Sequence, residues 1–267
     1  MPQVILITGA SSGIGKITAE FLVEKNFKVY GTSRNSNIKS QNKVEFIQLD
    51  LNDSVSIQKA VNQIIQKEGK LDILINNAGV GITGPVEETP IEAAKEHFQT
   101  NFFGVMELTQ EVLHYMQKQP NGQIINITSI AGYMGLPFRG YYSASKSALI
   151  TLTEALRLEL INTKIKVSCL APGDFATNIA SGRFTVKPNQ ESTYYKAYAE
   201  SLKLMNAHVN EANDPIEVAK TIYTIIQKEH PKVNYKVGST LQKFSVFLKG
   251  ILPNKVFEKM LAKHYKL

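Results

Sequence analysis

The sequence predicts an α/β fold with a doubly wound sheet of about seven parallel strands flanked by helices. Short apolar runs alternate with amphipathic runs along the 267-residue chain. A glycine-rich turn at residues 8–15 separates the first apolar run from the first amphipathic run. This order of strand, glycine-rich turn, helix and strand predicts a βαβ unit at the start of the chain.

Seven runs have the length and apolar character of strands, and they cover residues 4–7, 28–32, 44–49, 71–75, 123–127, 165–170 and 232–237. Helices are expected between them, one of them capped by Asp53 or Ser54. Two helical runs follow the fourth strand, and the second carries Asn101. A long helix begins near Tyr142, and 215–228 is expected to be the last regular helix.

No repeat, linker or low-complexity stretch divides the chain, so we expect one domain over residues 1–267. Residues from about 174 to 213 are aromatic-rich and are expected to be irregular, forming a lid over the substrate. The tail from about 241 to 267 mixes apolar residues and lysines at helical spacing, which predicts an amphipathic helix. Such a helix packs on its own domain or on a partner subunit, or it lies on an anionic membrane.

The composition is that of an ordinary globular protein, with 43% hydrophobic residues and a net charge of +7. A mildly basic chain suits an anionic small ligand. It has no dense basic block with interleaved aromatic residues, which disfavours nucleic-acid binding. The single cysteine, Cys169, excludes a disulfide within the chain and is expected in a strand core. A first strand at residue 4 and the lack of a long apolar run favour a cytoplasmic location.

Chemistry-bearing residues follow five of the predicted strands. These residues are Gly9–Gly15, Asp50, Asn76–Gly79, Ser129 and Pro172-Gly173. In an open parallel sheet, ligands bind beyond the carboxyl ends of the strands. The five segments are therefore expected to meet at one edge, with the helix after the glycines ready to receive a phosphate.

Tyr142 and Lys146 are four residues apart on the long helix. Their side chains differ by about 40° around the helix axis, whereas Tyr141 and Lys146 differ by about 140°. A nearby ammonium favours a phenolate, so Lys146 is expected to lower the pKa of Tyr142. A tyrosine–lysine pair of this spacing occurs roughly once by chance in such a composition, so its meaning depends on the rest of the chain.

Together these motifs resemble the short-chain dehydrogenase/reductase family, in its compact single-domain branch. The resemblance covers about residues 3–180 and rests on Thr8-Gly9-x-x-x-Gly13-x-Gly15, Asp50, Asn76-Asn77-Ala78-Gly79, Asn101, Ser129, Tyr142-x-x-x-Lys146 and Pro172-Gly173 with Thr177. It implies a Rossmann-type fold and a nicotinamide-dependent oxidoreductase that interconverts a carbonyl and an alcohol.

The resemblance also implies roles for four catalytic residues. Tyr142 would be the acid and base, and Lys146 would lower its pKa and hold the nicotinamide ribose. Ser129 would bind the substrate oxygen, and Asn101 would position a water near Lys146. The cofactor would be held by Gly9, Ser11, Ser12, Gly13, Ile14, Gly15, Ser33, Arg34, Asp50, Leu51, Asn77, Ala78, Gly79, Tyr142, Lys146, Pro172, Gly173 and Thr177. No metal is expected.

The second strand is followed by Ser33 and Arg34, where a member of the family that prefers NAD would place an acid. This pair indicates a preference for NADP(H). The substrate is expected to be a small or medium apolar ketone, aldehyde or alcohol, in a pocket with apolar walls. The candidate wall residues are Tyr133, Met134, Leu136, Phe138, Phe175, Phe184, Tyr194 and Tyr195.

Two alternatives remain open from the sequence. The first is a protein that binds the cofactor as a sensor or scaffold and turns nothing over, although the intact catalytic set argues against it. The second is epimerisation or dehydration on the same fold, for which the chain lacks the usual extra length. The helices that carry Asn101 and Tyr142 are apolar over more than one stripe, which predicts a homodimer or homotetramer.

Overall fold

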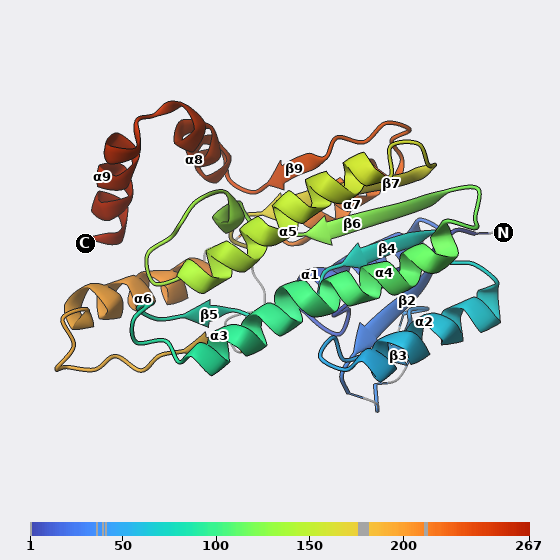
Figure 1. The fold of residues 1–267 in the computed structure, drawn as a ribbon, viewed down its shortest axis with the longest axis horizontal. Helices are drawn as coiled ribbons and strands as arrows, with labels where there is room; N and C mark the ends of the chain where they lie inside the picture. Colours follow the sequence, from blue (N-terminus) through green and yellow to red (C-terminus); the bar gives the residue numbers. More distant parts are fainter. Residues whose placement is uncertain (1, 36, 39, 41, 176–181, 211–212) are drawn as a thin grey trace.

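A parallel sheet of seven strands forms the centre of the molecule, in the order β3-β2-β1-β4-β6-β7-β9 (Figure 1). A computed structural model describes the chain except residues 1, 36, 39, 41, 176–181 and 211–212. The strands are β1 (Val4–Ile7), β2 (Lys28–Ser33), β3 (Glu45–Gln48), β4 (Ile73–Asn76), β6 (Gly122–Ile127), β7 (Ile165–Pro172) and β9 (Asn234–Val237). The predicted fold class is confirmed. The strand order reverses between β1 and β4, where doubly wound sheets bind their ligands.

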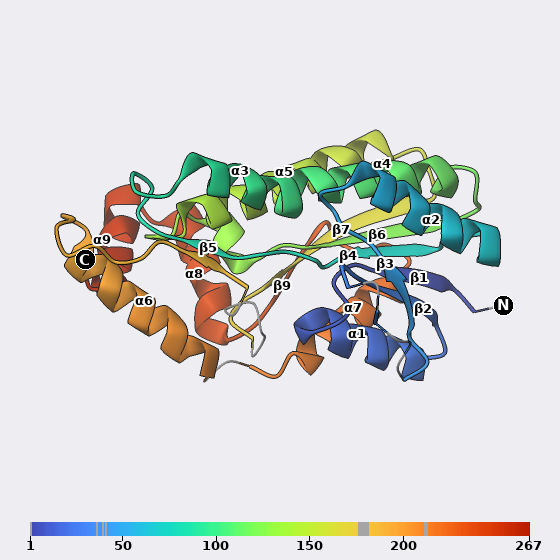
Figure 2. The same ribbon diagram turned by 90° about the horizontal axis from the view of Figure 1, so that it is seen from below.

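Two layers of helices cover the sheet (Figure 2). Helices α1 (Gly13–Glu24) and α7 (Ile216–Ile226) cover one face, while α2 (Ser54–Glu68), α4 (Gly104–Met116) and α5 (Gly140–Glu159) cover the other. Successive side chains of a strand point to opposite faces. Ile5 and Ile7 therefore join the core under α1 and α7, and Leu6 joins the core under α2 and α4. Because both faces of the sheet are buried, the strands appear in the sequence as continuous apolar runs.

Residues 174–213 are more regular than the sequence indicated. Strand β8 (Phe184–Thr185) pairs with β5 (Ile82–Thr83) in a separate two-stranded sheet, and α6 (Tyr195–Asn210) is a helix of 16 residues. The expectation of an irregular segment was wrong. Among the side chains of α6 that the structure describes, Tyr198, Ser201 and Met205 are buried. Such a narrow stripe among charged residues gives a weak helical pattern.

The tail forms two helices, α8 (Thr240–Ile251) and α9 (Asn254–Tyr265), so α7 is not the last regular helix. Ser239 begins α8 with a capping box, in which its side chain and that of Gln242 each accept from the other residue's backbone. Pro253 separates the two helices because proline cannot continue a helix interior. In α9, Phe257 and Tyr265 are buried. No helix in the described part of the chain is long and apolar enough to cross a bilayer.

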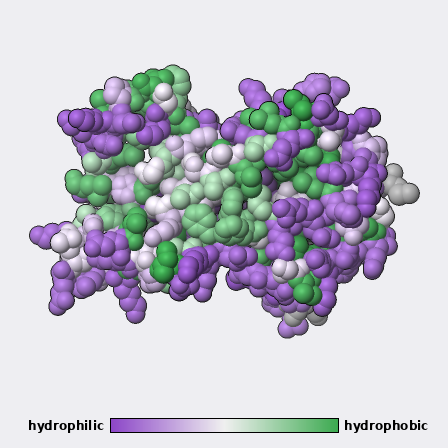
Figure 3. Space-filling model, viewed as in Figure 1, coloured by the Kyte–Doolittle hydropathy of each residue, from purple (hydrophilic) through white to green (hydrophobic). Residues whose placement is uncertain are grey.

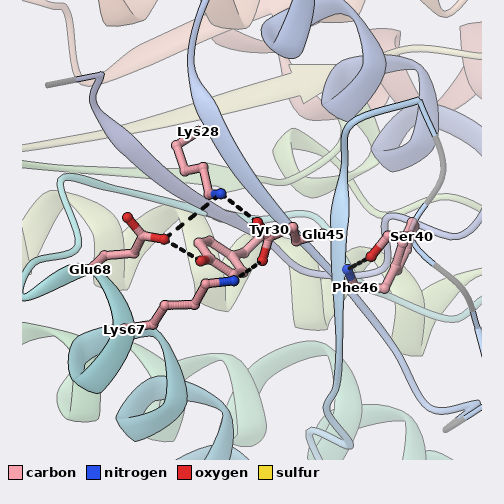
Figure 4. A network of polar contacts seen from close by, with 7 residues as sticks. All are labelled: Lys28, Tyr30, Ser40, Glu45, Phe46, Lys67 and Glu68. Carbon is pink, nitrogen blue, oxygen red and sulfur yellow. Dashed lines mark hydrogen bonds and ion pairs between the residues drawn. The ribbon is translucent and has the colours of Figure 1, made fainter.

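A network of charged side chains fastens the outer strands to α2 (Figure 4). Glu45 on β3 forms ion pairs with Lys28 on β2 and Lys67 on α2. The buried Tyr30 donates its hydroxyl to Glu68, and burial raises the pKa of Tyr30. These residues lie at the start of β2 and the end of α2, away from the carboxyl ends of the strands. We therefore assign the network to stability and not to chemistry.

Candidate active site

The glycine-rich turn forms an open cradle between β1 and α1. Gly9 and Gly13 have φ angles of 66° and 53°, a region that favours glycine. A Cβ on Gly15 would lie 2.3 Å from the carbonyl oxygen of Gly9, so any larger residue at this position would clash with the backbone of the turn. Ser11 and Ser12 are exposed, and the Ser12 side chain does not cap α1. The cradle fits a cofactor phosphate at a helix N-terminus.

The end of β4 is tied to this turn by Thr8. The Thr8 hydroxyl oxygen accepts from the backbone nitrogens of Asn77 and Ala78, each over 2.9 Å. The Asn77 side chain donates to the carbonyl oxygens of Thr8 and Gly9 over 2.9 and 3.3 Å. Asn77 and Ala78 thereby position the cradle. Asn76 lies deeper, where its amide donates to Thr109 and Asn126, and it belongs to the core.

The outer edge of the site is formed by the ends of β2 and β3. The Ser33 hydroxyl oxygen accepts from the backbone of Asn35, and Arg34 is exposed. Asp50 accepts from the backbone nitrogen of Asn52 over 3.0 Å and is half-buried. Leu51 is buried, and its carbonyl oxygen would lie 2.0 Å from a Cβ on Gly104, the first residue of α4.

Asn101 lies in a π-helical turn, η1 (Gln99–Phe103), which joins α3 (Ile91–Phe98) to α4 without a loop. The two helical runs expected here are therefore one continuous helix, with a π-helical turn at Asn101. π-Bulges are frequent at functional sites. The fully buried Asn101 side chain accepts from the nitrogen of Val80 over 2.8 Å and donates to its oxygen over 2.9 Å. It thus holds the segment that follows β4.

The lack of a side chain at Gly79 lets the side chains of Asn101 and Lys146 approach the backbone there. A Cβ at this position would lie 3.2 Å from Asn101 Oδ1 and 3.4 Å from Lys146 Nζ. Lys146 is buried on α5, and its ammonium donates to the carbonyl oxygen of Ile127 at the end of β6 over 3.1 Å. Burial lowers the pKa of Lys146 to about 8. A lysine with this pKa has a charge that responds to small changes in its surroundings.

Tyr142 is half-buried one turn before Lys146 on α5. Burial raises the pKa of its phenol, while a hydrogen bond with Ser129 and the charge of Arg139 lower it. The expectation that Lys146 lowers the pKa of Tyr142 was therefore wrong. The physical reason is that the ammonium is directed to Ile127, and burial outweighs the favourable contacts.

Ser129 brings β6 and β7 together at the site. It precedes a short 3-10 helix, η2 (Ile130–Tyr133), and its hydroxyl oxygen accepts from the backbone of Ala131 over 3.2 Å. Its hydroxyl also lies 3.5 Å from the carbonyl oxygen of Pro172, the last residue of β7. Gly173 follows and donates its backbone nitrogen to Val237 over 2.8 Å. Thr177 lies outside the described residues.

The structure adds a residue that sequence reasoning missed. His97 on α3 is buried, and its Nε2 lies 2.9 Å from Ser145 Oγ and 3.3 Å from Asn101 Nδ2. Burial and the charge of Lys146 lower the pKa of His97 to about 4, so its imidazole is neutral at pH 7. Its position four residues before Asn101 was the available signal, because side chains at this spacing share a helix face.

The expected apolar wall is only partly present. Phe138 packs against Tyr198 of α6, with ring centroids 5.2 Å apart. Phe175, in contrast, is buried in the core beneath the sheet. The Tyr133 hydroxyl donates to Asn234, and Phe184 is exposed. Phe175 and Tyr133 are therefore structural, because each fills a contact within the fold.

Comparison with known proteins shows the family to which a chain with this arrangement of residues belongs. A family model described as short chain dehydrogenase matches residues 3–187. The chain belongs to the short-chain dehydrogenase family. The expected resemblance is confirmed, and the protein is an oxidoreductase of this type. No group of three or more His, Cys, Asp and Glu residues in the described parts of the chain is placed to hold a metal ion.

Similar proteins cover the full length of this short-chain dehydrogenase. A 3-ketodihydrosphingosine reductase of Bacteroides thetaiotaomicron is 40% identical over 267 residues, 100% of this chain and 99% of that protein. An NADPH-dependent 3-dehydrocapnine reductase of Ornithobacterium rhinotracheale is 30% identical, over 98% of this chain and 96% of its own. A crystal structure of a short-chain dehydrogenase from Streptomyces avermitilis has a TM-score of 0.84 and 29% identity, and the match covers 100% and 97% of the two chains.

Proposed function

We propose that the protein reduces the carbonyl group of a long-chain ketone to an alcohol with NADPH, or oxidises the alcohol with NADP. The observation that carries the proposal is the convergence of Ser129, Tyr142 and Lys146 with the glycine cradle at one edge of the sheet. Ser129 lies close enough to the Tyr142 phenol to lower its pKa, and Lys146 lies one turn further along α5. Two hydroxyl donors at the same edge of the sheet suit a carbonyl oxygen that gains negative charge during reduction.

Each residue of the site has a step in this proposal. Ser129 donates a hydrogen bond to the substrate oxygen, keeps its proton and polarises the carbonyl. Tyr142 gives its phenolic proton to that oxygen as the alcohol forms. Lys146 would hold the nicotinamide ribose, and Asn101 holds the Val80 segment through its backbone nitrogen and oxygen. The bound nicotinamide supplies the hydride.

NADP(H) is the proposed cofactor because of the residues after β2. A carboxylate at this position would repel a 2′-phosphate, whereas Ser33 is neutral and the exposed Arg34 offers a planar fork of donors. The relative from Ornithobacterium rhinotracheale is named as NADPH-dependent. Asp50 would bind the adenine, Gly9, Gly13 and Gly15 the pyrophosphate, and Pro172, Gly173 and Thr177 the nicotinamide.

The substrate class is proposed from the relatives and the surroundings of the site. Two relatives are named as reductases of 3-ketodihydrosphingosine and of 3-dehydrocapnine. We propose a long-chain 2-amino ketone of this kind for the present chain. Residues 1–267 would act as one domain with 174–213 over the substrate. The free thiol of Cys169 fits a cytoplasmic location.

The test is a turnover assay with purified protein and NADPH against three ketones: a long-chain 2-amino ketone, the same chain without the amine, and a short ketone. We expect kcat/KM to be highest for the long-chain 2-amino ketone. Binding of NADPH without turnover of any ketone would favour the sensor or scaffold alternative. Turnover of the short ketone alone would overturn the proposed substrate class and leave the reaction standing.

A further inference from the structure

Helix α8 presents an apolar stripe to the solvent. Leu241, Phe244, Phe247 and Ile251 are 73%, 49%, 59% and 59% exposed. Their spacing of three and four residues places them along one side of the helix, and the rings of Phe244 and Phe247 stack with centroids 5.9 Å apart. No residue of α8 is buried. This set of four residues is called the α8 stripe below.

The other apolar residues at the end of α8 already have partners. Val246, Leu248 and Leu252 pack on the small core formed with Phe257 of α9 and residues of η2. These residues therefore attach α8 to the protein, while the α8 stripe stays exposed to solvent. Contiguous apolar surface of this kind usually marks a site of interaction with a protein or a membrane.

The charges around the stripe decide between these partners. Residues 240–267 contain six lysines and one glutamate, Glu258. Lys243, Lys255, Lys259 and Lys263 are exposed. In Figure 3 the region of α8 and α9 at the upper left shows hydrophobic atoms next to hydrophilic ones. A second copy of this surface would bring lysines against lysines, and lysine is depleted in protein interfaces. An anionic bilayer complements both the apolar stripe and the lysines.

The two tail helices are anchored on segments that flank the catalytic residues. Gln242 of α8 donates its side-chain amide to the Asp174 carboxylate over 2.7 Å, directly after Gly173. Tyr265 of α9 accepts from the Arg139 guanidinium over 2.6 Å, three residues before Tyr142. The two tail helices are therefore attached to the segments that adjoin Gly173 and Tyr142.

We infer that the α8 stripe and the surrounding lysines dock the protein on the surface of an anionic lipid bilayer. Lipid tails receive Phe244, Phe247 and their neighbours, while the lysines contact anionic headgroups. Neither part suffices alone, because stable peripheral binding needs an apolar and an electrostatic contribution together. The inference does not depend on the proposed reaction, since binding is measured without substrate or cofactor.

The experiment is co-sedimentation of the full chain with vesicles of phosphatidylcholine alone or mixed with phosphatidylglycerol. We expect binding to the mixed vesicles at low salt, little binding to the neutral ones, and release as salt is raised. Phe244→Ser with Phe247→Ser should lower the bound fraction about tenfold. Lys255→Gln with Lys259→Gln should also lower it and should reduce the salt dependence.

The matched control replaces two apolar residues of similar exposure on other helices. Val55 on α2 and Ile91 on α3 are 56% and 58% exposed, and Val55→Ser with Ile91→Ser should leave binding unchanged. Circular dichroism checks that each variant is folded. The inference is overturned if the wild type does not bind anionic vesicles at low salt, or if the phenylalanine variant binds them like the wild type. It is also overturned if that variant changes only the oligomeric state in light scattering, which would assign the stripe to a second copy.

Discussion

Lys146 Nζ donates to the carbonyl oxygen of Ile127 over 3.1 Å, which fixes the ammonium to the end of β6. Because the contact is a neutral carbonyl and not a carboxylate, it does not offset the cost of burying the charge. The pKa of Lys146 consequently falls to about 8. Burial also raises the pKa of Tyr142, one turn earlier on α5.

Cofactor binding should depend on this lysine and on pH. As pH rises through the Lys146 pKa of about 8, the side chain loses its charge, and we expect the Kd for NADPH to increase. Fluorescence titrations across this range measure the change. Lys146→Arg retains its charge and should show no rise near pH 8, because a guanidinium does not titrate there. A wild-type Kd that stays constant across this range would contradict the role of Lys146.

His97 should make folding sensitive to acid. Its pKa falls from 6.5 in the unfolded chain to about 4 in the folded protein, so only the unfolded chain is protonated between these values. The contribution to stability is complete above pH 6.5 and is lost as pH falls toward 4. Between about pH 7 and about pH 5 the loss is about 2 kcal/mol.

Urea unfolding of the wild type and of His97→Gln at both pH values tests this prediction. Glutamine keeps a polar group beside Ser145 but does not titrate. The variant should lose less stability on acidification than the wild type. Equal losses in the two proteins would show that another group causes the acid sensitivity.

Coenzyme choice should follow the residues after β2. Ser33→Asp with Arg34→Ala introduces a carboxylate and removes the guanidinium, and we expect preference to move from NADPH toward NADH by about ten- to a hundredfold. The ratio of kcat/KM for the two coenzymes measures the change. A wild type that prefers NADH, or a double variant whose ratio does not move, would contradict this assignment.

The assembly is expected to be a homodimer or homotetramer through α4 and α5. Phe103, just before α4, and Leu158, near the end of α5, are exposed. Phe103→Lys with Leu158→Lys places charges on this surface and should shift the protein to a monomer in light scattering. Leu241→Lys on α8 is the control and should leave the mass unchanged. A wild-type protein that is a monomer at micromolar concentration would contradict this prediction.

Local spacing and strand ends were enough to predict most of the site. Tyr142 and Lys146 share a helix, and Ser129, Asp50 and the glycine turn each follow a strand, so their meeting follows from parallel topology. The hydrogen-bond partner of Lys146 could not be predicted from the sequence, because it is the backbone oxygen of Ile127 on another element.

Other features depended on tertiary packing. The sequence shows His97 as a single histidine in a helical run, and only the fold brings it to Ser145 on α5. Helix α6 was missed because its buried stripe is narrow. The division of the tail into α8 and α9 follows from Pro253, which is visible in the sequence, but the side of α8 that packs is decided by Phe257.

The central claim is that the Tyr142 phenol delivers the proton to a substrate carbonyl. The direct test is the rate of NADPH oxidation with a long-chain 2-amino ketone in the wild type, Tyr142→Phe and Tyr141→Phe. Tyr142→Phe keeps the ring but removes the proton, so we expect turnover to fall at least about a hundredfold, in line with the usual contribution of a general acid, while NADPH binding and folding stay close to those of the wild type. Tyr141→Phe should retain most of its activity. Turnover by Tyr142→Phe above about a tenth of the wild-type rate would contradict the claim, because no general acid would then have been lost.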